Sequence, residues 1–193
     1  MKNKSKDIIN FLAEAGQLKR VKRSGWWVVG IKDPESVAEH CFRTAIIGYL
    51  LAKKENVDPY EVLLIALFHD THEARTNDLH KIGLKYFDFK PIEKKIAHEQ
   101  LSLTDNNVQK ELSAILSAYS LQKSKAAIIA RDADILECIL QGKEYLDQGM
   151  TQAKSFLSAG KKYLKTKSAK LLYQQILKWN YKNWWLHLTK FTR

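Results

Sequence analysis

The chain has 193 residues, of which 45% are hydrophobic, so it is long enough to bury the core of one domain. It contains no run of about 18 apolar residues, which excludes an ordinary transmembrane helix. The net charge is +11, and the N-terminal residues MKNKSKDIIN lack the apolar stretch of a signal peptide. We therefore expect a cytoplasmic protein whose two cysteines, Cys41 and Cys138, are reduced.

Amphipathic segments dominate the chain, and only 8 glycines and 3 prolines interrupt them, which indicates an all-α fold. The first helix is expected over residues 5–18, followed by a connection rich in basic and aromatic residues over 19–34. Ser36 and Glu39 match a capping box, in which each side chain bonds the other residue's free backbone N–H. This motif predicts a helix from residue 36 to about 54.

A very apolar segment follows and ends in a group of ionisable residues. Asp58 and Pro59 predict its helical start. Because VLLIALF is apolar nearly all round, we expect a central, buried helix that reaches His69 and Asp70 near its end. A loop with a short basic segment is expected over 74–90. The later helices are expected at about 91–102, 106–119 and 124–147, with one or two more within 151–193.

The C-terminal segment differs from the rest of the chain in its charge. After Asp147 there are nine lysines, one arginine and no acidic residue, so this segment carries +10 of the total charge of +11. We expect residues 1–150 to form the core domain, with the Trp-rich helices of 151–193 packed on it or on a second subunit. A basic segment with interleaved aromatic rings also suits single-stranded nucleic acid, whereas simple solvation of the charges is the alternative.

Four residues on three predicted helices have side chains that bind divalent metals. His40 lies one turn into the helix that begins at residue 36. His69 and Asp70 end the apolar helix, and Asp134 lies in a later one. Such a set of imidazole and carboxylate ligands suits Mn, Fe, Co, Ni or Zn better than Ca. A hydrogen-bonded structural histidine is the alternative, although a carboxylate directly after an apolar run is rarely buried without a partner or a metal.

Several hydrolase motifs are absent from the sequence. The pair His72-Glu73 does not begin an HExxH motif, because residue 76 is Thr, so a zincin protease is excluded on this motif. Neither the GxSxG elbow of serine hydrolases nor a GxxxxGK[ST] phosphate loop occurs.

The order His40, His69-Asp70, Asp134 resembles the H…HD…D signature of HD-domain metal-dependent phosphohydrolases. Three longer blocks resemble the 5′-deoxynucleotidase family within that superfamily, and the likeness spans residues 5–150. The blocks are GQLKRVKRSGWWVVGIKDPESVAEH (16–40), LLIALFHDTHEARTNDL (63–79) and DADILECILQGKEY (132–145).

The resemblance implies an HD-domain helical bundle, a homodimer and one divalent metal, with Mg among the candidate ions. The implied reaction is hydrolysis of a deoxyribonucleoside 5′-monophosphate to deoxynucleoside and phosphate. Glu73 and Asp78 match the family's acid and base positions, and a helix continuing past His69 would place Glu73 beside the metal. For Glu73 the alternative is a salt bridge with Arg75 or a nearby lysine. The residues that match the metal ligands are His40, His69, Asp70 and Asp134.

A phosphate monoester also needs a cation, and residues 19–23 supply four basic side chains just before Trp26. The resemblance implies that Arg23 orients the phosphate, with Arg20 in reserve, and that Trp26 lies beside the sugar. Two residues separate Arg23 from Trp26, unlike the tightest form of the family pattern, and Trp26 is equally expected as a core anchor. Asp78 and His80 are further candidates for contact with the substrate.

Two other functions fit parts of the sequence. One is an HD phosphohydrolase that acts on nucleoside triphosphates, guanosine tetraphosphate or phosphodiesters. The other is a nucleic-acid-binding protein that uses the basic C-terminal segment.

Overall fold

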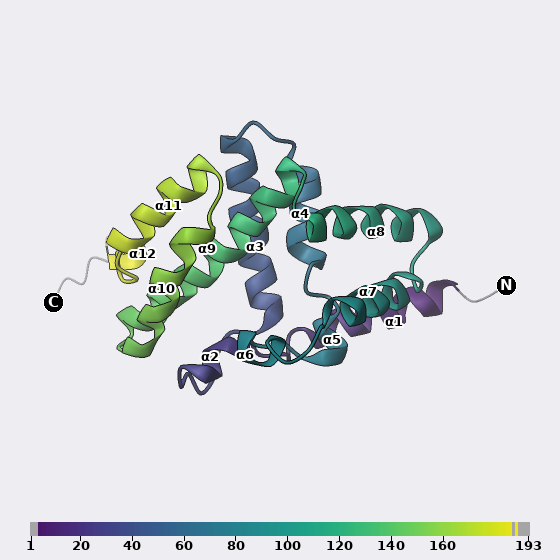
Figure 1. The fold of residues 1–193 in the computed structure, drawn as a ribbon, viewed down its shortest axis with the longest axis horizontal. Helices are drawn as coiled ribbons and strands as arrows, with labels where there is room; N and C mark the ends of the chain where they lie inside the picture. Colours follow the sequence, from purple (N-terminus) through teal and green to yellow (C-terminus); the bar gives the residue numbers. More distant parts are fainter. Residues whose placement is uncertain (1–3, 187, 189–193) are drawn as a thin grey trace.

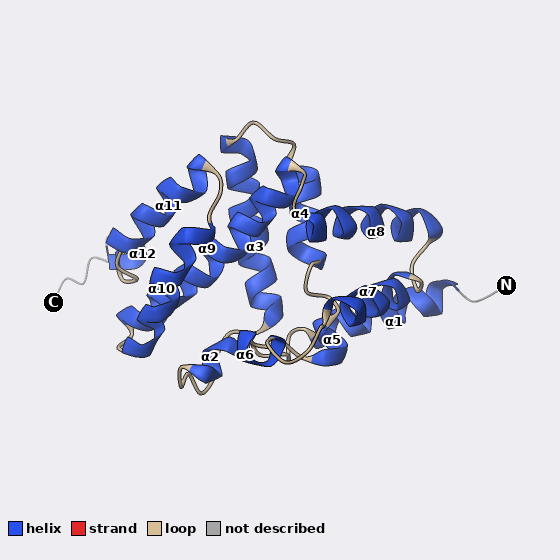
Figure 2. Cartoon of the chain, viewed as in Figure 1, coloured by secondary structure: helices blue, strands red, loops and turns tan. Residues whose placement is uncertain are grey.

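The computed structural model describes residues 4–186 and residue 188, and every regular element in that part of the chain is a helix (Figures 1 and 2). The predicted all-α fold is therefore confirmed. The helices of eight or more residues are α1 (Lys4–Gln17), α3 (Val37–Lys54), α4 (Pro59–Phe68), α7 (Lys90–Leu101), α8 (Asn106–Leu121), α9 (Lys125–Asp147) and α11 (Lys167–Lys178). The shorter ones are α2 (Gly25–Val28), α5 (Glu73–Thr76), α6 (Lys81–Leu84), α10 (Lys154–Gly160) and α12 (Asn183–Leu186), with 3-10 turns η1 (Thr151–Ala153) and η2 (Lys161–Tyr163).

Three helices form the centre of the fold, because α3, α4 and α9 all pack against one another. Helices α1, α7 and α8 lie on one side of this centre and α10, α11 and α12 on the other (Figure 1). The core includes fully buried Leu51, Ile65 and Leu136. The backbones of α3 and α4 approach closely at Gly48, where an added Cβ would lie 2.9 Å from Val62 Cγ1.

Local capping explains where three of the long helices begin. The Ser36 hydroxyl accepts a hydrogen bond from the Glu39 N–H, and the Glu39 carboxylate accepts one from the Ser36 N–H, so the capping box is confirmed. The Asp58 carboxylate accepts from the Tyr60 N–H at the start of α4. The Ser124 hydroxyl accepts from the Ala127 N–H at the start of α9.

Helix α4 is less buried than its composition predicts. Val62, Ile65 and Ala66 are buried, but Tyr60 and Leu67 are 55% and 44% exposed. The helix is central, as expected, but it is buried on only part of its surface, because α3, α8 and α9 do not surround it. Short helices α5 and α6 also replace the loop expected over 74–90, and α2 lies within the connection expected over 19–34.

The C-terminal segment packs on the chain's own core. Helices α10 and α11 contact α9, and the buried side chains Leu157, Leu164 and Ile176 join the same hydrophobic cluster as Leu136. The predicted C-terminal helical structure is present as α10, α11 and α12, while residues 187 and 189–193 lie outside the described part. Within the described residues, no helix combines the length and the hydropathy needed to span a bilayer.

Candidate metal centre

The four predicted ligand residues come from three packed helices. His40 lies in the first turns of α3, and Asp134 lies in the middle of α9. Helix α4 ends at Phe68, and His69 is its C-cap residue, with its N–H still bonded to the Ile65 carbonyl at 2.9 Å. His69 and Asp70 therefore lie where the rigid helix ends and the chain turns.

The structure brings these four side chains together. His40 Nε2 lies 3.3 Å from Asp134 Oδ1 and 3.9 Å from Asp70 Oδ2. His69 Nε2 lies 3.2 Å from the same Asp70 oxygen. Ligand atoms of His40, His69 and Asp134 all lie within 4.8 Å of one another. Two imidazoles and two carboxylates thus converge on one point, as the metal-site prediction requires.

The state of the ring nitrogens fits a metal in this position. His40 Nε2 and His69 Nε2 are buried, and neither has a hydrogen-bond partner among the described residues. The opposite nitrogens are engaged, because His69 Nδ1 contacts the Ala66 carbonyl at 3.1 Å and His40 Nδ1 contacts the Glu137 carboxylate. Each ring is therefore oriented with a free Nε2 towards the carboxylates, which is the arrangement of metal-binding histidines.

Charge is concentrated around this point. Burial and the charge of Arg23 would lower the pKa of His40, but Glu137 and Asp134 outweigh them and raise it to about 10. Burial would raise the pKa of Asp70, yet the neighbouring His69 and Arg23 lower it. Several anionic groups therefore share a buried space, and a divalent cation would offset their repulsion.

Glu73 lies beside the cluster, although not on a continuation of α4. Helix α4 ends at Phe68, close to the expected end, and Glu73 begins the separate helix α5, so the continuation past His69 that would place both residues on one face does not occur. Glu73 is 9% exposed, and its Oε2 has no hydrogen-bond partner within the described part of the chain. Burial, Asp70 and Asp78 raise the pKa of Glu73 to about 10. The alternative pairing with Arg75 does not form, because the Arg75 guanidinium binds other carboxylates, those of Glu14 and Glu99, at 2.7 Å.

Asp78 and Arg23 complete the polar side of the cluster. The Ser24 hydroxyl donates a hydrogen bond of 3.3 Å to Asp78 Oδ1. Arg23 Nη1 lies 3.5 Å from Asp70 Oδ2, and Arg23 Nε lies 3.8 Å from Asp78 Oδ2. Burial raises the pKa of Asp78, against the effect of Arg23. Arg23 is therefore a cation placed between two carboxylates of the site. Arg20, its reserve, is exposed and reaches Gln17 at 3.5 Å.

The side chain of Trp26 packs inside the fold. It is 1% exposed, and its ring centroid lies 4.2 Å from that of Phe156 and 5.1 Å from that of Tyr145. Its indole N–H donates to Glu35 Oε1 at 3.0 Å. The structure thus gives Trp26 the packing of a core anchor, and the predicted contact with a sugar would require the ring to become exposed.

Two further residues have structural positions that bear on the site. His80 is half-buried and caps α6, where its Nδ1 accepts from the Gly83 N–H at 3.3 Å. Glu137 is fully buried and contacts the ring of His40. Sequence reasoning gave Glu137 no role, although it stands three residues after Asp134 in the quoted DADILE block.

Comparisons with known proteins identify the family of the chain. A family model described as an HD domain matches residues 15–176. A protein of Bos taurus named 5'-deoxynucleotidase HDDC2 is 33% identical over 144 residues, covering 74% of this chain and 70% of that protein. The 5'-deoxynucleotidase VP0926 of Vibrio parahaemolyticus is 27% identical over 152 residues, covering 72% and 76% respectively.

A solved structure shares the fold. It is a conserved hypothetical protein from Pyrococcus furiosus, with a TM-score of 0.73 and 30% sequence identity, and the match covers 89% of this chain and 99% of that one. The resemblance read from the three sequence blocks is confirmed by these matches. With the family model spanning most of its length, the chain belongs to the HD-domain family.

Proposed function

We propose that the protein is a metal-dependent phosphomonoesterase that hydrolyses deoxyribonucleoside 5′-monophosphates to deoxynucleoside and phosphate. The observation that carries the proposal is the convergence of His40, His69, Asp70 and Asp134, with both Nε2 atoms free, next to the cation Arg23. The names of the bovine and Vibrio relatives supply the substrate class.

His40, His69, Asp70 and Asp134 would hold one divalent ion, and Mn, Co, Fe, Ni, Zn or Mg are the candidates for its identity. A divalent ion at this point supplies Lewis acidity, which polarises a phosphoryl oxygen and lowers the pKa of a nearby water. The remaining steps belong to side chains of this chain.

Arg23 is suited to bind the phosphate, because its guanidinium is held between Asp70 and Asp78 only at distances of 3.5 and 3.8 Å. Glu73 has an unpartnered buried oxygen beside the cluster. Burial and the charges of Asp70 and Asp78 raise its pKa, and a divalent cation bound there would lower that pKa again, so that the ionised carboxylate could take a proton from water. Asp78 has a raised pKa, which favours the protonated form needed to donate to the leaving 5′-oxygen. Asp78 and His80 lie together in the chain and are proposed to contact the substrate, and the sugar contact of Trp26 stays a prediction.

The test is phosphate release from a panel of all deoxy- and ribonucleoside 5′-monophosphates, deoxynucleoside triphosphates, guanosine tetraphosphate and a phosphodiester. Mn, Co, Mg or a chelator is added to each. Metal-dependent release from the deoxymonophosphates, lost in Asp70→Asn, supports the proposal. Asp58→Asn is the matched control, because Asp58 caps the opposite end of α4 and Asn caps a helix equally well. Release only from triphosphates or diesters would contradict the proposed substrate class. No release from any compound would contradict the proposed enzyme activity and favour nucleic-acid binding.

We also propose that two copies associate through an exposed apolar stripe on α3. Phe42, Ile46, Tyr49 and Leu50 are 67%, 47%, 43% and 50% exposed, and Leu63 of α4 lines the same hollow. A second copy covering this stripe would remove the apolar surface from water. Light scattering after size exclusion measures the mass, and Ile46→Lys should convert a dimer to a monomer.

A cytoplasmic location is proposed as well, in keeping with the free thiols of Cys41 and Cys138.

A further inference from the structure

Behind the candidate metal centre lies a buried ion pair that has no role in the proposed chemistry. His40 Nδ1 lies 2.5 Å from Glu137 Oε2, and both side chains are 0% exposed. This contact is on the face of the imidazole opposite Nε2, the nitrogen that faces Asp70 and Asp134. Glu137 therefore contacts His40 on the edge of the ring that points away from Asp70 and Asp134.

The second oxygen of Glu137 is held by Arg43. Arg43 Nε donates to Glu137 Oε1 at 2.9 Å, and Arg43 Nη2 lies 2.8 Å from the same oxygen. The rest of the guanidinium is also occupied. Nη1 donates to both carboxylate oxygens of Glu144, at 2.8 and 2.9 Å, and Nη2 donates to Gln141 Oε1 at 2.7 Å. The Arg43 side chain is thus fixed in one orientation, with an acceptor for each of its donor groups.

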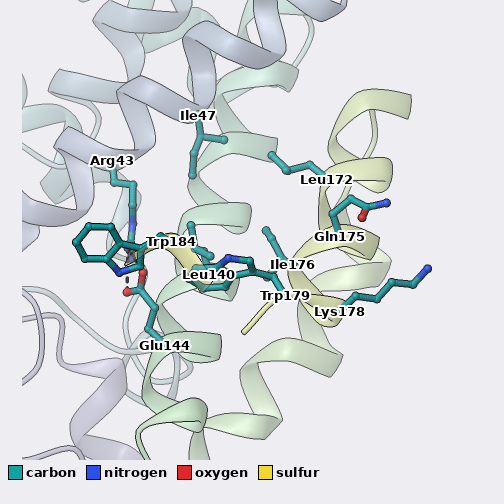
Figure 3. Close-up of a pocket in the computed structure, with 10 residues that line it drawn as sticks. All are labelled: Arg43, Ile47, Leu140, Glu144, Leu172, Gln175, Ile176, Lys178, Trp179 and Trp184. Atoms are coloured by element: carbon teal, nitrogen blue, oxygen red, sulfur yellow. Dashed lines mark hydrogen bonds and ion pairs between the residues drawn. The ribbon is translucent and has the colours of Figure 1, made fainter. Parts of the chain in front are cut away.

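The spacing along two helices produces this arrangement. His40 and Arg43 are one turn apart on α3, while Glu137, Gln141 and Glu144 follow one another at helical spacing on α9. Figure 3 shows Arg43 reaching from α3 to Glu144 at the edge of an apolar groove between α3, α9, α11 and α12. The row of polar contacts from His40 through Glu137 and Arg43 to Glu144 lies between α3 and α9. The metal centre lies at its His40 end and the groove at its Glu144 end.

We propose that Glu137 and Arg43 are positioning residues for the metal ligand His40. Glu137 accepts the Nδ1–H of the ring, which fixes the tautomer with an unprotonated Nε2 and increases the basicity of that nitrogen. Arg43 fixes the position of Glu137 and compensates its charge, since an unpaired carboxylate at this depth would be costly. The inference rests on the proposed metal site and not on the proposed substrate.

The direct test is calorimetric titration of the metal-free full chain with Mn²⁺. Glu137→Gln keeps the shape of the side chain but removes the charge, and it is expected to weaken Mn²⁺ binding by about 10- to 100-fold. Arg43→Gln is expected to weaken it by a smaller factor, because Glu137 remains. Glu111→Gln is the matched control, since Glu111 lies on α8, outside the Arg43 network, and accepts a hydrogen bond from the exposed Tyr60 hydroxyl. It should change the dissociation constant by less than about threefold, well short of the loss expected when the hydrogen-bond partner of a metal ligand is changed.

Two further readouts separate positioning from a merely structural role. The double variant Glu137→Gln/Arg43→Gln should bind Mn²⁺ no more weakly than Glu137→Gln alone, because both changes act through one carboxylate. Excess Mn²⁺ should also restore turnover by Glu137→Gln. Folding of each variant is checked by circular dichroism.

A folded Glu137→Gln variant that binds Mn²⁺ as tightly as the wild type would overturn the positioning role and leave the metal site intact. A wild-type chain that binds no Mn²⁺ would overturn the metal site and this inference together. Additive losses in the double variant would also contradict a shared path through Glu137.

Discussion

Asp132 and Asp134 stand two residues apart on α9, and the structure gives them opposite tasks. Residues at this spacing do not share a helix face. Asp134 faces His40. Asp132 is fully buried, and its side chain points from α9 to the residues that precede α11. The Asp132 carboxylate accepts hydrogen bonds from the Lys165 N–H at 2.8 Å and from the Thr166 N–H and hydroxyl, each at 2.7 Å. At about 1 kcal/mol for each of these bonds, Asp132→Ala should lower the free energy of unfolding by about 3 kcal/mol.

The assay is urea unfolding with and without saturating Mn²⁺. At a metal concentration of about 100 times the dissociation constant, the ion should add about 2.7 kcal/mol to the free energy of unfolding. Asp132→Ala should lose stability in both conditions and keep this increment. Asp134→Ala should lose the increment. The reasoning is refuted if the Asp132 variant no longer responds to Mn²⁺, or if the Asp134 variant still does.

Three further changes test packing and charge. Trp26→Ala should lower the free energy of unfolding by about 4 kcal/mol, because removal of the buried ring leaves a cavity. A loss below about 1 kcal/mol in urea unfolding would contradict the role of Trp26 as a core anchor. Gly48→Ala should cost about 1–3 kcal/mol, since its Cβ would lie 2.9 Å from the stiff Val62 side chain, and an unchanged melting temperature would contradict this. Burial and the charge of Glu137 raise the pKa of Glu35 from 4.5 to about 7. The folded state therefore keeps Glu35 protonated to a higher pH than the unfolded chain does. The free energy of unfolding falls as the pH rises from 4.5 to about 7. In metal-free protein Glu35→Gln should lose less stability than the wild type over that interval, and equal losses would contradict the assignment.

Local signals in the sequence were sufficient for most of the fold. The caps at Ser36 and Asp58 predict two helix starts, because each bond involves residues at most three positions apart. The four metal-ligand candidates came from their residue types on three predicted helices, and the order of motifs in a known family supported the choice. The structure brings them together from α3, from the turn that follows α4 and from α9.

Other features depend on contacts that no local pattern encodes. The contact between His40 and Glu137 joins residues 97 positions apart. Glu137 therefore resembles any helical glutamate in the sequence, and only the packing of α3 on α9 reveals its partner. The end of the apolar run predicts the end of α4, but the turn over residues 69–72 and the start of α5 at Glu73 are seen only in the structure. Burial of Trp26 depends on Phe156, which is 130 residues away and belongs to the segment expected as an extension.

Arg43 and Arg23 differ in how closely their donor groups are already paired, and this difference decides which of the two is available for a substrate. Arg43 has an acceptor for each donor group at 2.7–2.9 Å, so an incoming anion would have to displace these. Arg23 is only 18% exposed and lies at 3.5 and 3.8 Å from the carboxylates of Asp70 and Asp78, distances longer than those of a close ion pair. A phosphate dianion would give Arg23 shorter contacts. Arg23→Lys, which loses the bidentate geometry, should therefore raise KM for a deoxymonophosphate by about tenfold. The same change at exposed Arg20 should have no effect. Equal KM values for the two variants would assign phosphate binding to another group.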